Sequence, residues 1–465
     1  MASPLRQLSA CARRLSQWSF NELSSSFPEL GAALVGLDFE FRERLFSPVV
    51  TFWMFLSQVL SDGASCQEMV AKALAALWLT EERQSSPGNS AYCQARKRLP
   101  VAFLQRLADQ VAARLECQVK LNDLWMGRRV KIVDGSSLSM PDTVANQQAY
   151  PQPSGQKRGC GFPVMRLVVV FSLATGVILR LACGSLRQSE RALFQGLIEI
   201  LQPGEVLLAD RGFCGFADIC ILMTRGIDAV LRVQKCRWAG ARCMKRLGRG
   251  DRLVEWLRSS KVRPAWMEPK ARAEMPQTLT LREITYTVSV KGFRSKRIVL
   301  VTTLTDSKLF PRKAFAELYL QRWKAELFLR DIKISLHMDV LRCKTPEMIH
   351  KELWMHVIAY NLIRALMWSA AQRHCVDVFS ISFKSSLASI RQWAPWMAGL
   401  DPTSSRFSKT QELLLVYLAQ QRVPYRPNRV QPRARKRRPK NYPLLTAPRD
   451  KFKDIPHRSH YRRQA

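Results

Sequence analysis

The sequence predicts an α/β protein in which helices flank a mixed sheet, with a helical N-terminal domain and a β-rich insertion. Three patterns predict this fold. Apolar residues recur at helical spacing near the N-terminus, β-branched runs then alternate with helical segments, and strand-like runs separated by basic turns interrupt that alternation. The patterns divide the chain into a helical domain (1–125), a first part of the α/β core (126–233), a β-rich insertion (234–309), a second part of the core (310–372), a helical C-terminal region (373–420) and a basic tail (421–465).

The N-terminal domain is predicted to be a small helical unit. VVTFWMFLSQVL (49–60) and QEMVAKALAALWL (67–79) carry apolar residues at helical spacing, and SDGAS (61–65) separates them. A basic cluster precedes a further helical pattern at 101–116. Helical units of this kind often dock on DNA, but helix bundles without that role are equally common. The segment alone therefore leaves DNA binding open.

The core begins with strands. RRVKIVDGSSL (128–138) is a β-branched run that ends in Asp-Gly-Ser, and two further runs read as a hairpin around residues 174–176. EVLLAD (205–210) and DAVLRV (228–233) are short strand patterns separated by a helical one. This order suits a mixed sheet with helices on its faces.

The charge balance points to a polyanionic partner. Lys and Arg number 73 against 37 Asp and Glu, which gives a net charge of +36. Long-range attraction to a polyanion such as DNA explains this excess better than a solvated surface does. No apolar run approaches the roughly 18–20 residues of a membrane-spanning helix. We expect no membrane partner and a cytoplasmic location, with the scattered cysteines reduced rather than holding zinc.

Two acidic residues follow strand patterns in the core. Asp134 closes KIVD and Asp210 closes VLLAD. Strand ends are where sites form on α/β sheets, although a single Asp there is more often a turn residue or an N-cap. Neither residue alone indicates a catalytic role.

The helical segment ELYLQRWKAELFLRDIKISL (317–336) carries a polar line between two apolar strips. At about 100° per residue, four polar side chains fall in one narrow sector. They are Tyr319, Arg322, Glu326 and Lys333; the strips are Leu320, Trp323, Leu327 and Ile334 on one side and Leu318, Leu329, Ile332 and Leu336 on the other. A solvated Arg322–Glu326 pair, worth about 0.3–0.5 kcal/mol, would explain the polar line but not two strips, which we expect to bury the helix on both sides.

Together, Asp134, Asp210 and Glu326 predict a metal site. Three clustered carboxylates repel one another unless cations neutralise them, and oxygen ligands without Cys or His select Mg²⁺ or Mn²⁺. Two such ions can activate the attacking oxygen and stabilise the leaving oxygen of a phosphodiester. Arg322 and Lys333 would then hold phosphate oxygens, and Tyr319 would hydrogen-bond the same phosphate. Asp306 is a weaker alternative for the third ligand.

These residues resemble a known family. The spacing Tyr319-x2-Arg322-x3-Glu326-x6-Lys333 is that of the YREK signature of DDE transposases of the insertion-sequence-4 family. The same order of Asp134-Gly135 and Asp210-Arg211-Gly212-Phe213 precedes it, and the likeness covers roughly residues 85–460.

The resemblance implies an RNase H-like catalytic core with a β-strand insertion, and an N-terminal domain that binds DNA. It implies metal-dependent cleavage at transposon ends and strand transfer into target DNA. It also implies that the protein is a homodimer in the synaptic complex and is associated with the nucleoid. Relatives with a hairpin intermediate use a Trp of the insertion to stabilise a flipped base. Trp238, Trp256 and Trp266 are the candidates here.

Two other functions remain open from the sequence. The first is a two-metal nuclease of related fold that cuts DNA without joining it. The second is a catalytically silent, transposon-derived DNA-binding protein. The presence of all three acids together with Tyr319, Arg322 and Lys333 argues against loss of catalysis.

Overall fold

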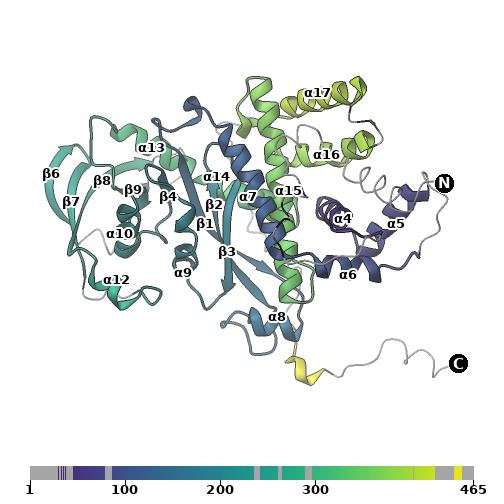
Figure 1. The fold of residues 1–465 in the computed structure, drawn as a ribbon. Coiled ribbons are helices and arrows are strands. Elements are labelled where there is room, and N and C mark those ends of the chain that lie inside the picture. The colour runs from purple at the N-terminus through teal and green to yellow at the C-terminus, as the bar shows by residue number, and fades with distance from the viewer. Residues whose placement is uncertain are drawn as a thin grey trace.

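The structure is a computed structural model. It describes residues 30, 33, 35, 37, 45–78, 86–234, 241–259, 264–288, 296–398, 400–401, 403–424 and 445–452. Within these ranges one sheet of nine strands, in the order β3-β2-β1-β4-β5-β9-β8-β7-β6, runs through the protein (Figure 1). The basic run RARKRRPK (433–440) and Trp238 lie outside the described residues.

The first five strands form the mixed half of the sheet. β1 pairs antiparallel with β2, which pairs antiparallel with β3, while β4 lies parallel to both β1 and β5. The predicted hairpin is confirmed, with Gly176 at φ +73° in its turn, a backbone conformation that glycine adopts without strain. The bounds are β1 Val130–Ser139, β2 Val164–Ser172, β3 Ile178–Ser185, β4 Val206–Ala209 and β5 Asp228–Arg232.

The insertion extends this sheet instead of forming a separate one. β9 pairs antiparallel with β5, and β8, β7 and β6 follow outward as antiparallel neighbours. The insertion is therefore β-rich as predicted. Its elements are β6 Arg242–Gly248, β7 Asp251–Leu257, α12 Pro269–Ala273, β8 Thr278–Val288 and β9 Lys296–Thr302.

Helices precede, cover and follow the sheet. The longest, α15, spans 28 residues, begins at a Pro and has Thr345 as its N-cap. The helices of the N-terminal part are α4 Pro48–Leu60, α5 Cys66–Trp78, α6 Ser90–Arg98 and α7 Val101–Cys117. The others are α8 Val144–Ala149, α9 Glu190–Gln195, α10 Phe216–Thr224, α13 Arg312–Gln321, α14 Trp323–Arg330, α15 Pro346–Arg373, α16 Phe383–Ala398 and α17 Ser405–Gln420. Short 3-10 helices are η1 Leu121–Asp123, η2 Ile198–Ile200, η4 Val378–Ser380 and η5 Arg449–Lys451, and η3 Asp331–Ser335 is a π-helical turn.

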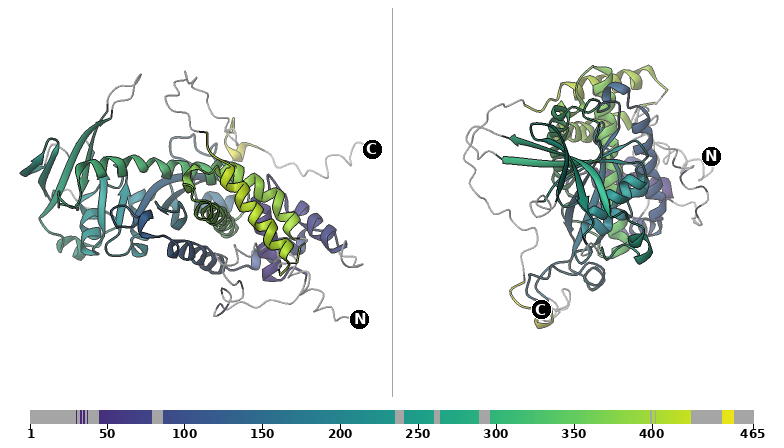
Figure 2. Two further views of the ribbon diagram at one scale, coloured as in Figure 1. Left: turned by 90° about the horizontal axis from the view of Figure 1, so that it is seen from above. Right: turned by 90° about the vertical axis from the view of Figure 1, so that its left-hand side faces the viewer.

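Two apolar cores lie on opposite faces of the sheet, because alternate strand residues point to opposite sides. Ile132 and Leu208 join the core that includes α14 and α15, while Val133 and Leu207 join the core beneath α9 and α10. Seen from above, α13 and α14 run along one side of the sheet, opposite α9 and α10 (Figure 2). The fold class predicted from the sequence is confirmed.

The first core also takes in helices from both ends of the chain. Residues of α4, α7, α16 and α17 belong to the same apolar cluster as α14 and α15. The domain boundaries drawn from the sequence stay predictions, since they concern how the chain divides and not which elements it forms.

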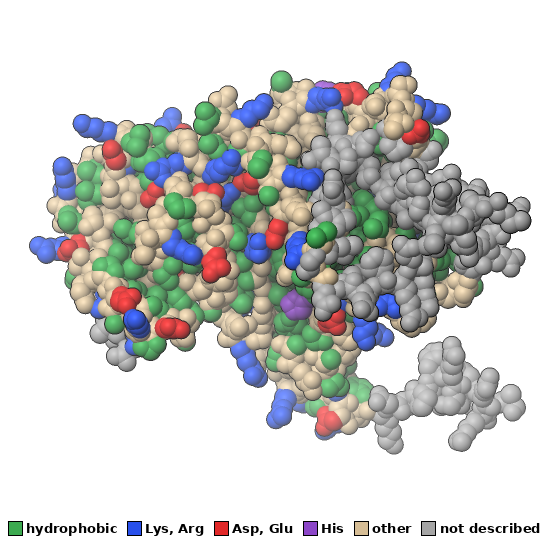
Figure 3. Space-filling view, in the orientation of Figure 1, with side chains coloured by type: hydrophobic (Ala, Val, Ile, Leu, Met, Phe, Trp, Pro, Cys, Tyr) green, Lys and Arg blue, Asp and Glu red, His purple; other side chains and the backbone are tan. Residues whose placement is uncertain are grey.

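Charge on the visible face is mixed. Over α9, α10 and β3, Lys and Arg side chains are interspersed with Asp and Glu (Figure 3). The excess of positive charge is thus not concentrated on this face. Among the described residues, no helix combines the length and the apolar character needed to cross a membrane.

Candidate active site

Asp134 and Asp210 lie together because their strands are parallel neighbours. The register pairs Ile132 of β1 with Leu208 of β4. Asp134 comes two residues after Ile132, and Asp210 comes two residues after Leu208. The backbone N–H of Gly135 donates to Asp134 Oδ1 at 2.9 Å, and that of Gly212 donates to Asp210 Oδ1 at 2.6 Å. The expectation that a strand ends at Asp134 is wrong, because β1 continues to Ser139 and Asp134 pairs with Val169 of β2. Asp210 directly follows the last residue of β4.

Helix α14 brings Glu326 and Arg322 to the same edge, where Arg322 lies between two carboxylates. Its guanidinium donates to Glu326 Oε1 at 2.8 Å and lies 3.9 Å from Asp134 Oδ2. The side chains of Arg322 and Asp134 are only 17% and 19% exposed. The Arg322–Glu326 pair weighed as an alternative therefore exists, but it lies next to Asp134, with Arg322 largely buried and Glu326 40% exposed.

The charge on Asp134 is poorly compensated. Burial and, to a smaller extent, the carboxylates of Asp210 and Glu326 together raise the pKa of Asp134 to about 6, against the Gly135 hydrogen bond and the charge of Arg322. The structure therefore brings all three predicted acids within electrostatic range. At pH 7 the site holds more negative charge than Arg322 neutralises.

Tyr319 is more deeply buried than its predicted phosphate contact suggests, with 7% of its surface exposed. Burial raises the pKa of its hydroxyl, against the nearby positive charges of Arg322 and Arg232. The hydroxyl is therefore a protonated donor at neutral pH, close to two guanidinium groups.

Lys333 reaches the strand that carries Asp134. Its Nζ donates to Ser136 Oγ at 2.9 Å and to the carbonyl of Ser137 at 2.8 Å. The residue lies in the π-turn η3, whose wider winding turns the helix relative to a regular α-helix. The ammonium group of Lys333 thus contacts β1 two and three residues beyond Asp134.

The expectation that two apolar strips bury this helix is wrong for one of them. Leu318, Leu329, Ile332 and Leu336 are buried as predicted, each at most 7% exposed. On the other strip, Leu320, Trp323 and Ile334 are 59%, 58% and 46% exposed. Leu327 of this strip is half-buried, so this side of the helix is only partly covered in the described part of the chain.

The other sequence candidates fall elsewhere. Asp306 is exposed and accepts hydrogen bonds from the backbone N–H groups of Lys308 and Leu309, so it closes a turn. Trp256 is a core residue of β7, 6% exposed, and Trp266 packs partly buried against the same core.

Arg232 was missed by sequence reasoning. It ends β5, the strand next to β4 in the sheet, and its charge acts on Tyr319. The rule that drew attention to Asp134 and Asp210, that parallel strands end at one edge, would have found it.

The oxygen ligands suit a hard divalent cation, but the arrangement is not that of a closed metal site. In the described part of the chain no three Asp, Glu, His or Cys side chains are close enough to hold one ion. Arg322 occupies the position between Asp134 and Glu326. Metal binding at these acids therefore requires Arg322 to withdraw from Glu326, and the raised pKa of Asp134 supplies the electrostatic reason for a cation to replace it.

Comparisons with known proteins identify the family of the chain. Residues 125–362 match the family model described as the transposase DDE domain. The chain is 29% identical to the transposase InsG for insertion sequence element IS4 of Escherichia coli K12 over 373 residues, which covers 78% of this chain and 80% of InsG. It is 30% identical over 125 residues to the putative transposase InsZ of the same organism, covering 27% of this chain and 42% of InsZ.

A more distant structure, that of a piggyBac transposase synaptic complex with hairpin DNA, covers 88% of this chain and 85% of its own, with a TM-score of 0.42 and 12% identity. This likeness is too distant to add to the assignment. The family model spans half of the chain and includes Asp134, Asp210 and Glu326. Enzymes of this family cleave DNA and transfer its strands, and they generally depend on divalent metal ions. The chain belongs to the DDE transposases of the insertion-sequence-4 family.

Proposed function

We propose that the protein cuts a mobile element at its ends and joins these ends to target DNA by a cut-and-paste mechanism, with Asp134, Asp210 and Glu326 as the catalytic residues. The observation that carries this proposal is the position of Arg322, which lies between Asp134 and Glu326 beside a carboxyl group whose pKa is raised to about 6. Carboxylates this poorly neutralised are suited to a cationic cofactor.

The cofactor is Mg²⁺ or Mn²⁺, bound as two ions by the three acids. When bound, such a pair supplies activation of the attacking oxygen and stabilisation of the leaving oxygen at a phosphodiester. Asp134 presents its carboxylate from within β1, Asp210 from the end of the neighbouring strand β4, and Glu326 from α14.

The remaining residues of the signature hold the DNA. Arg322, once it releases Glu326, can bind a phosphate in a bidentate manner. Tyr319 offers a protonated hydroxyl next to it. Lys333, whose Nζ donates to Ser136 Oγ two residues beyond Asp134 on β1, is placed to bind a phosphate close to the acids.

The partners are the inverted repeats at the transposon ends and the target DNA, with two copies of the chain in the synaptic complex. The net charge of +36 supports binding to DNA, which is a polyanion. A DNA-bound enzyme of a bacterial element would reside in the cytoplasm with the nucleoid.

Strand transfer from pre-cut ends tests this proposal against a nuclease that only cuts. Purified protein, Mg²⁺, a labelled duplex of the element's terminal repeat with a free 3′-hydroxyl, and a supercoiled target plasmid are incubated together. We expect labelled plasmid in which the end is covalently joined. Release of cut ends without any joined product would reject strand transfer and leave the nuclease function.

A further inference from the structure

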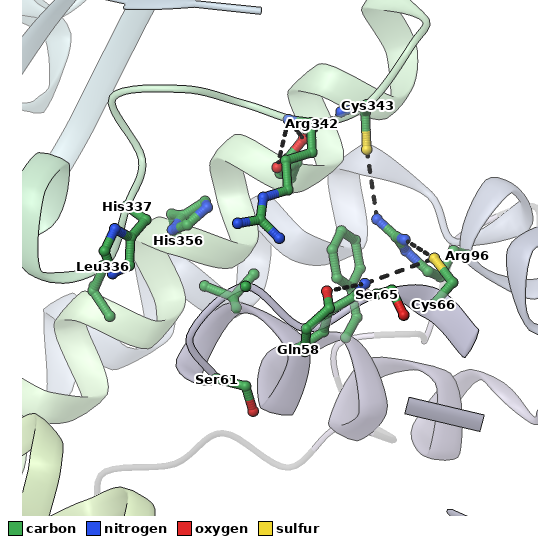
Figure 4. Close-up of a pocket in the computed structure, with 15 residues that line it drawn as sticks. Gln58, Ser61, Ser65, Cys66, Arg96, Leu336, His337, Arg342, Cys343 and His356 are labelled. Carbon is green, nitrogen blue, oxygen red and sulfur yellow. Dashed lines mark hydrogen bonds between the residues drawn. The ribbon is translucent and has the colours of Figure 1, made fainter. Parts of the chain in front are cut away.

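A cavity of about 300 Å³ lies away from the three acids, between the N-terminal helices and the segment that follows the catalytic helix. One side comes from α4 and the turn after it, and the other comes from the loop after η3 and from α15 (Figure 4). This volume is in the range of pockets that hold small molecules. The cavity is larger than an inorganic anion such as phosphate. A ligand that fills it therefore needs an uncharged part as well as a charged group.

The two sides of the cavity differ in chemistry. Phe55, Val59, Ala64 and Leu336 line it and are buried apolar residues. Arg342 and His356 lie side by side on the wall formed by α15 and the loop after η3, and His337 lies beyond His356, next to Leu336 (Figure 4). The cavity thus offers an apolar surface beside a group of basic side chains.

Arg96 forms the innermost part of the lining. It is 7% exposed, its guanidinium lies 3.9 Å from the centroid of the Phe55 ring, and it donates to Cys66 Sγ at 2.9 Å and to Cys343 Sγ at 3.5 Å. These contacts hold a planar cation at the wall of the cavity. Planar cations and aromatic rings are the surfaces on which nucleobases stack in proteins that bind single nucleotides.

The acidic groups nearby are already engaged. Glu352 accepts the backbone N–H groups of Arg342 and Cys343 at 2.9 Å each, and burial raises its pKa. Asp62, at the mouth, lies 3.1 Å from His337 Nε2. The basic character of Arg342 is therefore left for a ligand.

His356 supplies an independent sign that a ligand belongs here. It is 5% exposed, lines the cavity, and its Nδ1 has no hydrogen-bond partner among the described residues. Burial and the charges of Arg342 and His337 lower its pKa to about 3, so the ring is neutral and can donate one N–H. A buried polar atom without a partner is destabilising, and a ligand group that came within hydrogen-bond distance of Nδ1 would remove that cost.

We propose that this cavity binds a nucleotide, with the phosphate on Arg342 and His356 and the base against Val59, Leu336 and the plane of Arg96. The apolar side of the cavity holds the base of the nucleotide, and the basic side holds its phosphate. A free phosphate ion has no base to fill the apolar side. The nucleotide comes either from solution or from a DNA strand that the protein holds. This site is separate from the three acids and does not depend on their proposed roles.

Binding of dAMP to the full chain tests the proposal without metal. The chain has six histidines, so protein labelled with ¹⁵N only at histidine gives a spectrum simple enough to assign with His356→Gln and His337→Gln. We expect saturable shifts of the His356 and His337 resonances on addition of dAMP, with His374 unmoved. Inorganic phosphate and deoxyadenosine, added separately, should each bind more weakly than dAMP.

Substitution of Arg342 supplies the decisive comparison. Arg342→Ala should weaken dAMP binding about tenfold, because one charge-assisted contact is lost, and Arg342→Lys should retain part of it. Arg225→Ala removes another exposed arginine, one outside the cavity, and should leave binding unchanged. Equal dAMP affinity in Arg342→Ala and the wild type, or no shift of His356, would overturn the proposal.

The source of the nucleotide follows from competition. A short single-stranded oligonucleotide and a blunt duplex are each added to the protein–dAMP complex, and the His356 resonance is followed. Displacement of dAMP by either DNA identifies the occupant as a nucleotide of a bound strand. Retention of dAMP in the presence of both identifies a free nucleotide, and either result supports the site.

Discussion

The two halves of the sheet use buried charge in opposite ways. In the insertion, Arg282 and Asp251 are 1% and 7% exposed and form two hydrogen bonds of 2.8 and 2.6 Å, and Arg282 also donates to the carbonyl of Phe310 at 2.7 Å. In the catalytic half, Asp134 has its nearest cation, Arg322, at 3.9 Å. The first arrangement completes the pairing of both ions, whereas the second leaves a carboxyl group with a pKa of about 6.

This difference separates a structural ion pair from a site prepared for a ligand. A buried ion pair with full hydrogen bonding fixes the relative positions of the elements it joins, here β7, β8 and the loop before α13. A carboxylate that lacks a close partner makes the folded protein less stable but binds an incoming cation well. The following predictions test whether the two halves differ in this way.

The largest effect is expected in the catalytic half. Asp134→Asn, Asp210→Asn or Glu326→Gln should each reduce Mg²⁺-dependent cleavage of an end duplex by about a thousandfold or more, because each removes a metal ligand, while binding of the duplex stays largely intact. Cleavage rates and gel-shift affinities measure the two properties. Asp306→Asn, at an acid that closes a turn, is the matched control, and full activity in Glu326→Gln would reject the assignment.

The insertion should respond in stability. Arg282→Met leaves Asp251 buried without its partner and should cost about 3–5 kcal/mol in the free energy of unfolding, measured by denaturant titration. The double substitution Arg282→Met with Asp251→Leu removes both charges and should recover much of this loss. A double variant as unstable as the single one would show that the pair does not act as a unit.

Asp134→Asn should make the metal-free protein more stable at neutral pH, by about 1–3 kcal/mol. The folded state raises the pKa of Asp134 from 3.8 to about 6, so the folded protein binds this proton more tightly than the unfolded chain does. The stability that the proton contributes is present below pH 3.8 and is lost as the pH rises to about 6. As the pH rises from about 4 to about 7, the melting temperature of the wild type should therefore decrease relative to that of Asp134→Asn.

Magnesium provides the control for that pH dependence. Because the cation replaces the missing partner of Asp134, Mg²⁺ should raise the melting temperature of the wild type at neutral pH and should have little effect on Asp134→Asn. If Mg²⁺ left the melting temperature of the wild type unchanged, the metal-binding role of Asp134 would be contradicted.

Lys333→Ala should have a smaller effect on catalysis. The substitution removes one ammonium group that contacts β1 next to Asp134, so cleavage of a short end duplex should fall about tenfold, with Lys333→Arg less affected. Steady-state rates at saturating and subsaturating duplex separate weaker binding from slower chemistry. Unchanged rates on short duplexes would mean that Lys333 holds no phosphate.

The smallest effect concerns the exposed apolar strip. Trp323→Ala should change the free energy of unfolding by less than about 0.5 kcal/mol, because the side chain is 58% exposed. Leu329→Ala, one of the buried residues of the opposite strip, should cost about 2–4 kcal/mol. Equal losses in the two variants would show that another segment of the protein covers Trp323.

The sequence predicted the sheet and the three acids because these depend on local pattern. Strand runs leading to Asp134 and Asp210 need only a period of two and a turn signal, and the YREK spacing is fixed within one segment. The exposure of Trp323 could not be predicted, because a helical wheel does not show which segments of the chain pack against each face of the helix. The Arg282–Asp251 pair was equally hidden, since 31 residues separate its members and only strand register joins them.

The π-turn at Asp331–Ser335 has a consequence for how this region tolerates changes in length. A turn that winds over five residues instead of four holds in effect one additional residue, so deletion of a single residue there could restore a regular helix. Glu326, which precedes the turn, would keep its place, whereas Lys333 and the chain leading into α15 would be rotated. Deletion variants of this short segment could therefore uncouple the position of the lysine from that of the glutamate, which no side-chain substitution can do.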